Sequence, residues 1–555
     1  MNKTIAIHCI NTGTTKIVSR GTSLVQVIRD FGVKMKNPIL GALVNNVLQE
    51  INFEAFHPLS VQFIDITHPD GVRMYFRSLS FVLYKAADEL FPASKLLIDH
   101  SISKGVYCKV SVAGKDLSAE DITAIKQRMQ EIVDADIPFI LVEEETEEVI
   151  RKFEAHGLVD KISLLKHKGQ NFSSYYKLDG HIGSFYGCMV PSTAYLKIFD
   201  LNRYYNGLLL QVPQTNNPEQ VENLVIQNKL FEIFQEFSQW IKILEVPNVS
   251  DLNNSCSNGK SEVLIKVSEA LHEKKIGQIA DNIRMRNNQV KVILISGPSS
   301  SGKTTFAKRL AVQLMVNGMK PLNLSLDNYF VDRDKTPLDV NGNHDYEAVE
   351  ALDIPLFNQN ILELLNGDKI EIPKFLFESG TRFYSGETMQ MLPENVLIIE
   401  GIHGLNPMLT SSIPAEAKFK IYVSALTSLN IDDHNRVSTT DNRLIRRIVR
   451  DYRYRKYSAR ETISRWQSVR LGEEKHIFPY QEEADTMFNS ALLYELAVLK
   501  PFAEPILLEV QPNQPEYSEA TRLLNFFSYF RPLKPTEIPP TSILREFLGG
   551  SSFSY

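Results

Sequence analysis

The stretch Lys291-Val-Ile-Leu-Ile-Ser-Gly-Pro-Ser-Ser-Ser-Gly-Lys-Thr-Thr305 decides the fold of the second half of this chain. It joins a buried-strand pattern at 291–296 to the motif G-x-x-x-x-G-K-[ST] at 297–304, and helical apolar spacing follows over 305–315. Glycines let backbone amides turn towards phosphate oxygens, and the helix N-terminus adds partial positive charge. The sequence therefore predicts a phosphate-binding loop (P-loop) between a strand and a helix.

The loop residues define a nucleotide site. Lys303 can reach the outer phosphates of ATP and assist the reaction, and Thr304 can offer its hydroxyl to Mg²⁺. A chance Gly/Ser turn is the alternative, but the strand before and the helix after argue against it. We assign nucleotide binding to Gly297, Pro298, Ser299, Ser300, Ser301, Gly302, Lys303, Thr304 and Thr305.

Two carboxylates follow further strand patterns. Asp327 comes directly after 321–326, and Glu400 ends the buried pattern 396–399. The carboxyl ends of parallel strands meet at one edge of a sheet, where ligands bind. We expect Glu400 to hold Mg²⁺ with Thr304, and Asp327 to accept or align the proton of a substrate hydroxyl. For Glu400 the alternative is a strand-end carboxylate that serves only solvation or capping.

Arginines crowd the stretch 443–470, which holds nine of them and one lysine against only two acidic residues. Clustered guanidiniums can clamp a transferring phosphoryl group. A solvated helix or an RNA-backbone patch with interleaved tyrosines are the alternatives. Four arginines share one helix face by their i, i+3, i+4, i+7 spacing: Arg443, Arg446, Arg447 and Arg450. We assign nucleotide binding to Arg443 and catalysis to Arg446 and Arg450.

The ordered motifs GPSSSGKTT, DNYF, HDYEAVEALDIPLF, IPKFLF, VLIIEGIHGL and DNRLIRRIVRD resemble the uridine kinase family and its relative phosphoribulokinase over about 290–505. The resemblance implies a P-loop kinase that phosphorylates a small-molecule hydroxyl. It also implies Asp345 near the acceptor sugar and a lid formed by the arginines of 443–450. With Asp345, we place Tyr329 and Phe375 at the acceptor. Phe375 and Gly380 stand where the family has a tyrosine and a histidine that read the pyrimidine, so the polar groups for that reading are absent.

The front half resembles other modules. Residues 1–66 resemble a TGS domain through Gly21-Thr-Ser-Leu24, Gly41-Ala-Leu-Val-Asn-Asn46 and the strand pattern 61–65. Residues 70–215 resemble the editing-type domain of threonyl-tRNA synthetase. The family's metal-binding or catalytic positions carry no matching group here, and Cys188 does not align with the family cysteine. Those positions hold Arg77, Phe81, Phe185 and Met189. We therefore expect a binding or regulatory module that does not edit tRNA.

The organisation that follows is a multidomain α/β and α+β protein with a doubly wound, mainly parallel kinase sheet. Residues 118–121 predict a helix-capping box, 143–148 a helix start, 217–245 a long amphipathic helix, and 248–260 a polar loop. The segment 540–550 has no assigned function. The expected domains are a β-grasp at 1–66, an editing-like domain at 67–240, a connecting helix or linker at 241–289, the kinase at 290–505 and a tail at 506–555.

Composition sets the wider limits. The chain has 555 residues, 43% of them hydrophobic, and a formal charge of −6, so it is neither disordered nor a polycation. Four cysteines without a CxxC pair exclude a thiolate zinc cage and a disulfide framework. No apolar run reaches the ~20 residues of a membrane span, and the start lacks a signal-peptide pattern. We expect a cytoplasmic protein with no membrane partner that can form homo-oligomers.

Two functions stay open at this point. The first is an ATP- and Mg²⁺-dependent kinase of a small-molecule hydroxyl, a nucleoside or sugar-like acceptor, whose front half regulates it through tRNA or a nucleotide effector. The second is an RNA- or ribosome-associated P-loop nucleotide switch without kinase activity. Salt-sensitive tRNA binding would distinguish the second from the first.

Overall fold

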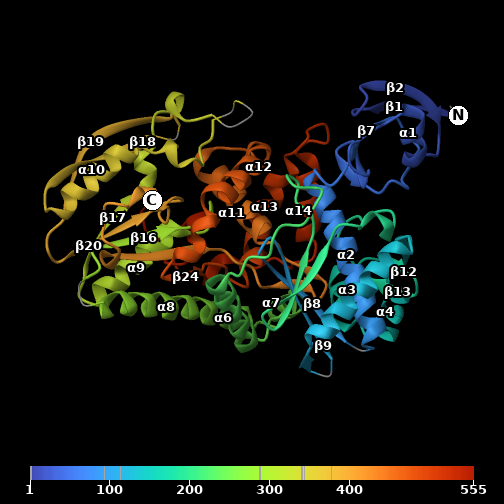
Figure 1. The fold of residues 1–555 in the computed structure, drawn as a ribbon, viewed down its shortest axis with the longest axis horizontal. Coiled ribbons are helices and arrows are strands. Elements are labelled where there is room, and N and C mark those ends of the chain that lie inside the picture. The colour runs from blue at the N-terminus through green and yellow to red at the C-terminus, as the bar shows by residue number, and fades with distance from the viewer. Residues whose placement is uncertain are drawn as a thin grey trace.

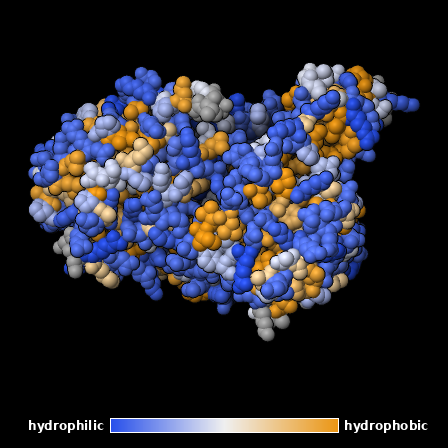
Figure 2. Space-filling model, viewed as in Figure 1, coloured by the Kyte–Doolittle hydropathy of each residue, from blue (hydrophilic) through white to orange (hydrophobic). Residues whose placement is uncertain are grey.

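The computed structural model describes residues 3–92, 94–112, 114–286, 289–338, 342, 344–376 and 378–554. Figure 1 shows a small N-terminal unit and a second α+β unit beside it, with a larger α/β unit making up the other end of the elongated molecule. Phe377, part of one of the motifs quoted above, lies outside the described residues. In the part of the chain that is described, no helix is long and apolar enough to cross a membrane. Figure 2 accordingly shows hydrophilic residues over most of the visible face, with only scattered apolar groups.

The N-terminal unit is a five-stranded sheet in the order β2-β1-β7-β4-β5, packed with one helix. Ser23 caps that helix by accepting a hydrogen bond from the amide of Gln26, and Gly32 ends it in the left-handed conformation. Its elements are β1 (Thr4–Cys9), β2 (Thr14–Ser19), β3 (Thr22–Ser23), α1 (Leu24–Phe31), β4 (Gly41–Val44), β5 (Val47–Gln49), β6 (Glu54–Ala55) and β7 (Leu59–Ile64).

The second unit begins with α2 (Pro69–Leu90), which packs between two antiparallel sheets and further helices. The capping box at Ser118 and Asp121 is confirmed. The acidic run 143–148 differs from expectation, since it finishes a strand before a helix begins at Thr146. The other elements are β8 (Lys95–Ile102), β9 (Gly105–Val112), β10 (Lys115–Asp116), α3 (Ala119–Asp134), β11 (Ile140–Glu145), α4 (Thr146–Ala155), α5 (Val159–Lys168), β12 (Phe172–Leu178), β13 (His181–Gly183), β14 (Asp200–Tyr204) and β15 (Gly207–Gln211).

Three helices connect this unit to the α/β unit: α6 (Asn228–Leu244), α7 (Val249–Ser257) and α8 (Ser261–Met285). The expected helix over 217–245 therefore starts eleven residues later than predicted. The expected loop 248–260 is mostly helical, because Asn248 caps α7 by accepting a hydrogen bond from the amide of Asp251. A local cap thus outweighs the low helix propensity of this Ser/Asn-rich stretch.

The α/β unit contains a five-stranded, wholly parallel sheet in the order β17-β20-β16-β21-β24. The strand before the P-loop, β16, is central, and every one of its residues is buried. Its elements are β16 (Val292–Ser296), α9 (Lys303–Val316), β17 (Lys320–Ser325), α10 (Ile354–Leu365), β18 (Lys369–Leu376), β19 (Thr381–Gln390), β20 (Asn395–Glu400), β21 (Lys418–Ser424), β22 (Asn430–Asp432), β23 (Asn435–Arg436), α11 (Thr439–Arg455), α12 (Ala459–His476), β24 (Thr486–Asn489) and α13 (Glu495–Leu508). The doubly wound parallel sheet is as expected.

The residues after 505 are part of the same unit and not an extended tail. α14 (Tyr517–Phe527) and α15 (Arg545–Leu548) place side chains in the core that also contains β16 and α9. Ile543, Leu544 and Phe547 are fully buried there. The segment between the two helices contains four prolines at 532–540; Pro535 begins a short 3₁₀ turn, and Ile538 is buried.

A hairpin of the α/β unit, β22–β23, docks into the second unit. Asn430 donates to the carbonyl of Ile98 at 2.9 Å, and the buried Lys161 pairs with Asp432 at 2.7 Å. His434 lies 4.6 Å from the ring of Tyr84. The two units are therefore joined by buried polar contacts and not by a flexible linker alone.

A second junction is built on Arg522 of α14. Its guanidinium donates to both carboxylate oxygens of Asp441 at 2.8 Å, to Glu519 at 2.6 Å and to the Tyr186 hydroxyl at 2.8 Å. Glu519 also accepts from Arg73 of α2 at 2.9 Å. Burial alone would raise the pKa of Glu519, but Arg522 and Arg73 outweigh it and hold that pKa far below its ordinary value of 4.5.

We expect Arg522→Met to lower the free energy of unfolding by about 3–5 kcal/mol, because it leaves Asp441 and Glu519 buried with too few partners. The depressed pKa of Glu519 stabilises the fold fully above pH 4.5, and this stabilisation is lost as pH falls below 4.5 towards the folded-state pKa. The acid sensitivity of unfolding below pH 4.5 should accordingly be smaller in the variant. Urea unfolding from pH 7 down to pH 3 measures both effects. Arg151→Met, which removes an exposed pair with Glu148, is the matched control and should cost less than about 1 kcal/mol. Equal stability of Arg522→Met and wild type would contradict this account.

Candidate active site

Two glycines of the P-loop are required by its geometry. A Cβ at Gly297 would lie 1.9 Å from the carbonyl oxygen of Val423 on the neighbouring strand, so only glycine permits this close approach. Gly302 has a φ of +84°, which side chains rarely tolerate, and it precedes the first residue of α9. The loop is thus held between the central strand and the helix N-terminus, as the motif predicts.

Lys303, Thr304 and Glu400 meet at the carboxyl edge of the sheet. The Thr304 hydroxyl lies 3.4 Å from a carboxylate oxygen of Glu400, and Ser325 donates to the same oxygen at 2.9 Å. Lys303 is buried and its ammonium group donates to the carbonyl of Pro298 at 3.1 Å. Burial lowers the pKa of Lys303, and the negative charges of Glu400 and Asp327 oppose that shift.

Asp327 lies in the short 3₁₀ turn Leu326–Tyr329 that directly follows β17. The hydroxyl of Ser325 accepts a hydrogen bond from the Asp327 amide at 3.3 Å, which fixes the start of this turn. Burial first, and the charge of Asp327 second, raise the pKa of Glu400 to about 7. The two carboxylates and Lys303 therefore act on one another across one small site, as the strand ends predict.

The oxygens at this edge suit Mg²⁺. The carboxylates of Glu400 and Asp327 and the hydroxyls of Thr304 and Ser325 are hard ligands, and Mg²⁺ is usually held by one or two carboxylates together with substrate phosphates. The described residues contain no group of three or more His, Cys, Asp or Glu that could hold a metal ion alone. The donor set fits a metal that arrives with the nucleotide.

The arginines of α11 differ from the expected lid. Arg443 and Arg446 are 1% and 0% exposed, and they pair with Glu473 and Glu495, which are also buried. Their guanidiniums contact backbone carbonyls of the P-loop. Arg443 donates to the carbonyl of Ser299 at 2.9 Å, and Arg446 lies 3.5 Å from the carbonyl of Ser300. In this conformation both side chains hold the loop and do not form a mobile cover.

The next two arginines of α11 are less deeply buried. Arg447 donates to the Ser299 hydroxyl at 2.9 Å, and Arg450 donates to Asp451 at 2.8 Å. Their side chains are 14% and 15% exposed. Of the four arginines on the predicted face, these two are the more exposed.

Several groups at the loop carry no sequence motif. Glu473 of α12 accepts a hydrogen bond from the Ser299 amide at 3.0 Å, and Ser490 donates to the carbonyl of Ser301. Glu546 of α15 accepts from the hydroxyl of Thr305 at 2.6 Å. Each comes from a segment far from the loop in the chain. No spacing rule could have found them, because only the folded chain brings these segments together.

Glu347 is a further unanticipated carboxylate near the loop. Burial, followed by the charge of Glu473, raises its pKa to about 7. Its oxygen Oε2 is buried and has no hydrogen-bond partner. Its side chain packs so closely on Gly472 that a Cβ there would lie 2.3 Å from the Glu347 Cβ. The sequence places Glu347 within the motif that begins at His344, two residues after Asp345.

The residues predicted at the acceptor are divided. Asp345 is half-buried and accepts a hydrogen bond from the Glu347 amide at 3.1 Å, and its carboxylate lies 3.7 Å from Nε2 of His476. Tyr329 is fully buried, accepts a hydrogen bond from Asn360 at 3.1 Å and packs on Phe357, and its contact with the acceptor stays a prediction. Its ring fills the core beneath the turn that carries Asp327. Phe375, in β18, lies 5.6 Å from the ring of Phe330.

The corresponding positions of the front half serve packing. Arg77 donates to the carbonyl of Cys188, Phe81 and Phe185 have ring centres 5.0 Å apart, and Met189 is buried. His434 of the docked hairpin stacks on Phe185 at 6.2 Å. The hairpin of the α/β unit therefore contacts one of these four residues, Phe185.

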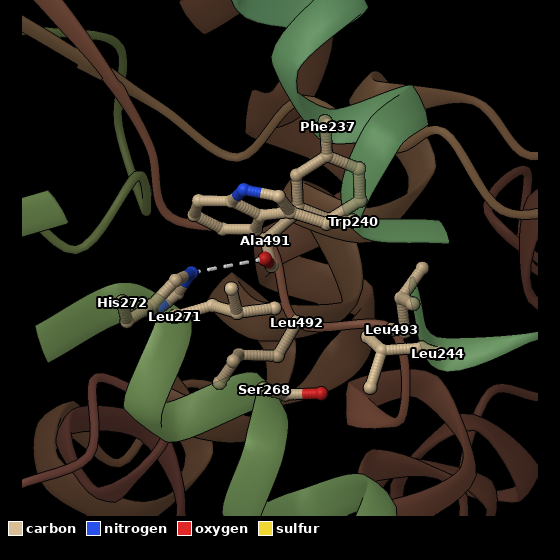
Figure 3. A pocket seen from close by; sticks show the side chains of 9 residues that line it. All are labelled: Phe237, Trp240, Leu244, Ser268, Leu271, His272, Ala491, Leu492 and Leu493. Carbon is tan, nitrogen blue, oxygen red and sulfur yellow. Dashed lines mark hydrogen bonds between the residues drawn. The ribbon is translucent and has the colours of Figure 1, made fainter. Parts of the chain in front are cut away.

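A small cavity lies away from these groups. Figure 3 shows it between α6, α8 and the loop after β24, with His272 donating to the carbonyl of Ala491 at 3.2 Å. Burial lowers the pKa of His272 well below its ordinary value, so the ring is neutral. The cavity has a volume of about 10 Å³, which is room for about one water molecule. The cavity is too small for a substrate.

Comparison with known proteins agrees with this geometry. Residues 292–492 match the family described as Phosphoribulokinase / Uridine kinase. A uridine kinase of Staphylococcus aureus (strain JH9) is 31% identical over 196 residues, which are 35% of this chain and 84% of the relative. The chain belongs to this family. A uridine kinase of Deinococcus deserti is 29% identical over 208 residues, which are 37% of this chain and 91% of the Deinococcus kinase.

A relative of a different kind also matches. The threonine–tRNA ligase of Syntrophomonas wolfei is 27% identical over 186 residues, 33% of this chain. The match spans only 29% of the ligase. This family member thus combines a P-loop kinase region with a segment that is similar to part of a tRNA ligase.

Proposed function

We propose that this protein transfers the γ-phosphate of ATP to a hydroxyl of a small nucleoside- or sugar-like acceptor. The observation that carries the proposal is the meeting of Asp327, Lys303 and Glu400 at one edge of a parallel sheet, beside the P-loop. The charge of Asp327 acts on both Lys303 and Glu400, so a phosphate bound to the loop would lie near its carboxylate. Family membership supports the same reaction class.

The chain's own groups account for the proton transfer and for part of the charge balance in the transfer step. Asp327 accepts the hydroxyl proton of the acceptor, the acceptor oxygen forms a bond to the γ-phosphorus, and the bond from that phosphorus to the ADP oxygen breaks. Lys303 and the amides of the loop balance the negative charge of the phosphates, and Arg450 and Arg447 supply further positive charge. Thr304 and Glu400 would hold Mg²⁺, which supplies charge neutralisation on the phosphates when it is bound.

The acceptor need not be a pyrimidine nucleoside. Phe375 and Gly380 lack the polar groups for reading a base edge, and Gly380 packs so closely that a Cβ would lie 2.6 Å from Arg333. Asp345 and Glu347 instead offer carboxylate oxygens to hydroxyls of the acceptor. We therefore favour a polyhydroxylated acceptor whose hydroxyls donate to these carboxylates.

For the front half we propose a regulatory role without tRNA editing, because packing residues occupy the places of catalytic ones. The TGS-like fold assignment of residues 1–66 and a tRNA or nucleotide effector belong to this proposal. The RNA-associated switch is less favoured, since Arg443 and Arg446 are buried and cannot reach an RNA backbone.

Incubation of the purified protein with ATP, Mg²⁺ and a panel of nucleosides, sugars and polyols tests the proposal directly. We expect ADP release that depends on one class of acceptor, with a phosphorylated product identified by mass spectrometry. Folded protein that gives no product with any acceptor, and that binds tRNA in a salt-sensitive manner, would favour the switch instead.

A further inference from the structure

The segment 541–550 lies directly on the P-loop. Ile543 packs on Gly302 so closely that a Cβ on that glycine would lie 2.6 Å from its Cγ2. The ring of Phe547 lies 5.1 Å beneath the guanidinium of Arg446. Figure 1 marks the C-terminus over the sheet of the kinase region. The end of the chain is therefore built into the wall of the nucleotide site.

Glu546 places a carboxylate on an amide of the loop helix. Its Oε2 accepts hydrogen bonds from the Thr305 hydroxyl at 2.6 Å and from the Thr305 amide at 3.3 Å. Thr305 is the third residue of α9, and first-turn amides have no partner within their helix. In a P-loop these amides, together with the helix dipole, attract phosphate. The charge of Glu546 also acts on Lys303 and on Glu400.

The carboxylate thus holds a position where bound phosphate would bring negative charge of its own. We propose that Glu546 is an internal anion that competes with the nucleotide for the P-loop, so that ATP binds only by displacing this carboxylate from Thr305. The proposal rests on the nucleotide site of the proposed function and adds to it a residue that sets nucleotide affinity.

The backbone around Glu546 stays in place during this exchange. Ile543, Leu544 and Phe547 are fully buried, and Arg545 donates to the carbonyl of Pro535 at 3.0 Å. A Cβ on Gly549 would lie 2.6 Å from Nε of Arg453 in α11, so this glycine packs directly against that arginine. Only the side chain of Glu546 has to turn away. The competition is therefore a property of one side chain on a fixed scaffold.

The decisive measurement is the Kd of a non-hydrolysable ATP analogue with Mg²⁺, determined by calorimetry on the full chain. Glu546→Gln keeps the shape and a hydrogen-bond acceptor but removes the charge, and we expect its Kd to be at least about tenfold lower than that of wild type. Glu546→Asp keeps the charge but withdraws it by one methylene, and we expect a smaller decrease. The second variant keeps the test valid if the first does not fold.

Glu537→Gln is the matched control, because Glu537 lies in the same C-terminal stretch and makes only a loose pair with Lys266 at 3.9 Å. Its Kd should equal that of wild type. Equal affinity of Glu546→Gln and wild type would overturn the inference and leave the kinase proposal standing. Weaker binding by Glu546→Gln would overturn it too, since Glu546 would then assist the nucleotide. Absence of binding by every folded variant would contradict the nucleotide site and the inference with it.

Discussion

Asp327→Asn is expected to lower kcat by about 10³-fold, within the 10²–10⁴-fold range typical of a lost general base. Asparagine keeps the size of the side chain, and the hydrogen bond from the backbone amide of residue 327 to Ser325 is unaffected. Its side-chain amide cannot accept the proton of the acceptor hydroxyl. ATP affinity should stay within about threefold of wild type, because binding rests on the loop amides and on Lys303.

Single-turnover transfer and nucleotide binding, measured separately, test this expectation. Asp368→Asn serves as control, because Asp368 is an exposed turn residue near the start of β18. A variant that keeps kcat within tenfold of wild type would remove the proton-accepting role of Asp327. Loss of ATP binding alongside kcat would instead place Asp327 among the nucleotide or metal ligands.

Arg446→Met is expected to lower the free energy of unfolding by about 3–5 kcal/mol and to weaken ATP binding together with it. Arg446 and Glu495 form a fully buried pair, and loss of one partner leaves the other charge uncompensated. Arg446 also donates to the carbonyl of Ser490 at 2.8 Å, and Ser490 in turn donates to the carbonyl of Ser301. The substitution therefore removes the support of the P-loop as well as a charge.

A double variant separates this scaffold role from a catalytic one. Arg446→Met with Glu495→Gln removes both charges, so part of the lost stability should return. A residue that contacts the transferring phosphate would behave differently, with a loss of kcat, unchanged unfolding and no rescue by Glu495→Gln. Arg450→Met is the matched comparison on the same helix, since its side chain is 15% exposed and supports no loop carbonyl that the structure records among the described residues.

Local patterns account for what could be predicted at the site. The run 291–305 specifies strand, loop and helix because each part depends on neighbours in the chain: apolar residues for the buried strand, glycines for the loop, and helical spacing after it. The approach of Asp327 and Glu400 also followed, since both end strands that belong to one parallel sheet.

The surroundings of the Tyr329 side chain could not be predicted from the motif. A motif places a tyrosine two residues after Asp327, but the 3₁₀ turn directs it towards Asn360 and Phe357 and away from the site. Likewise, helical spacing showed that Arg443 and Arg446 share a face, yet it could not show what that face meets.

By itself, the sequence determined the P-loop, the parallel sheet, the two strand-end carboxylates and the kinase family, because these depend on short-range patterns and on their order. Only the tertiary structure decided that Arg443 and Arg446 brace the loop, that His434 of the hairpin β22–β23 stacks on Phe185 of the front half, and that Glu546 accepts a hydrogen bond from the Thr305 amide. The physical reason is that a buried charge takes its partner from whichever segment folds against it, and those partners lie 30 to 271 residues away along the chain.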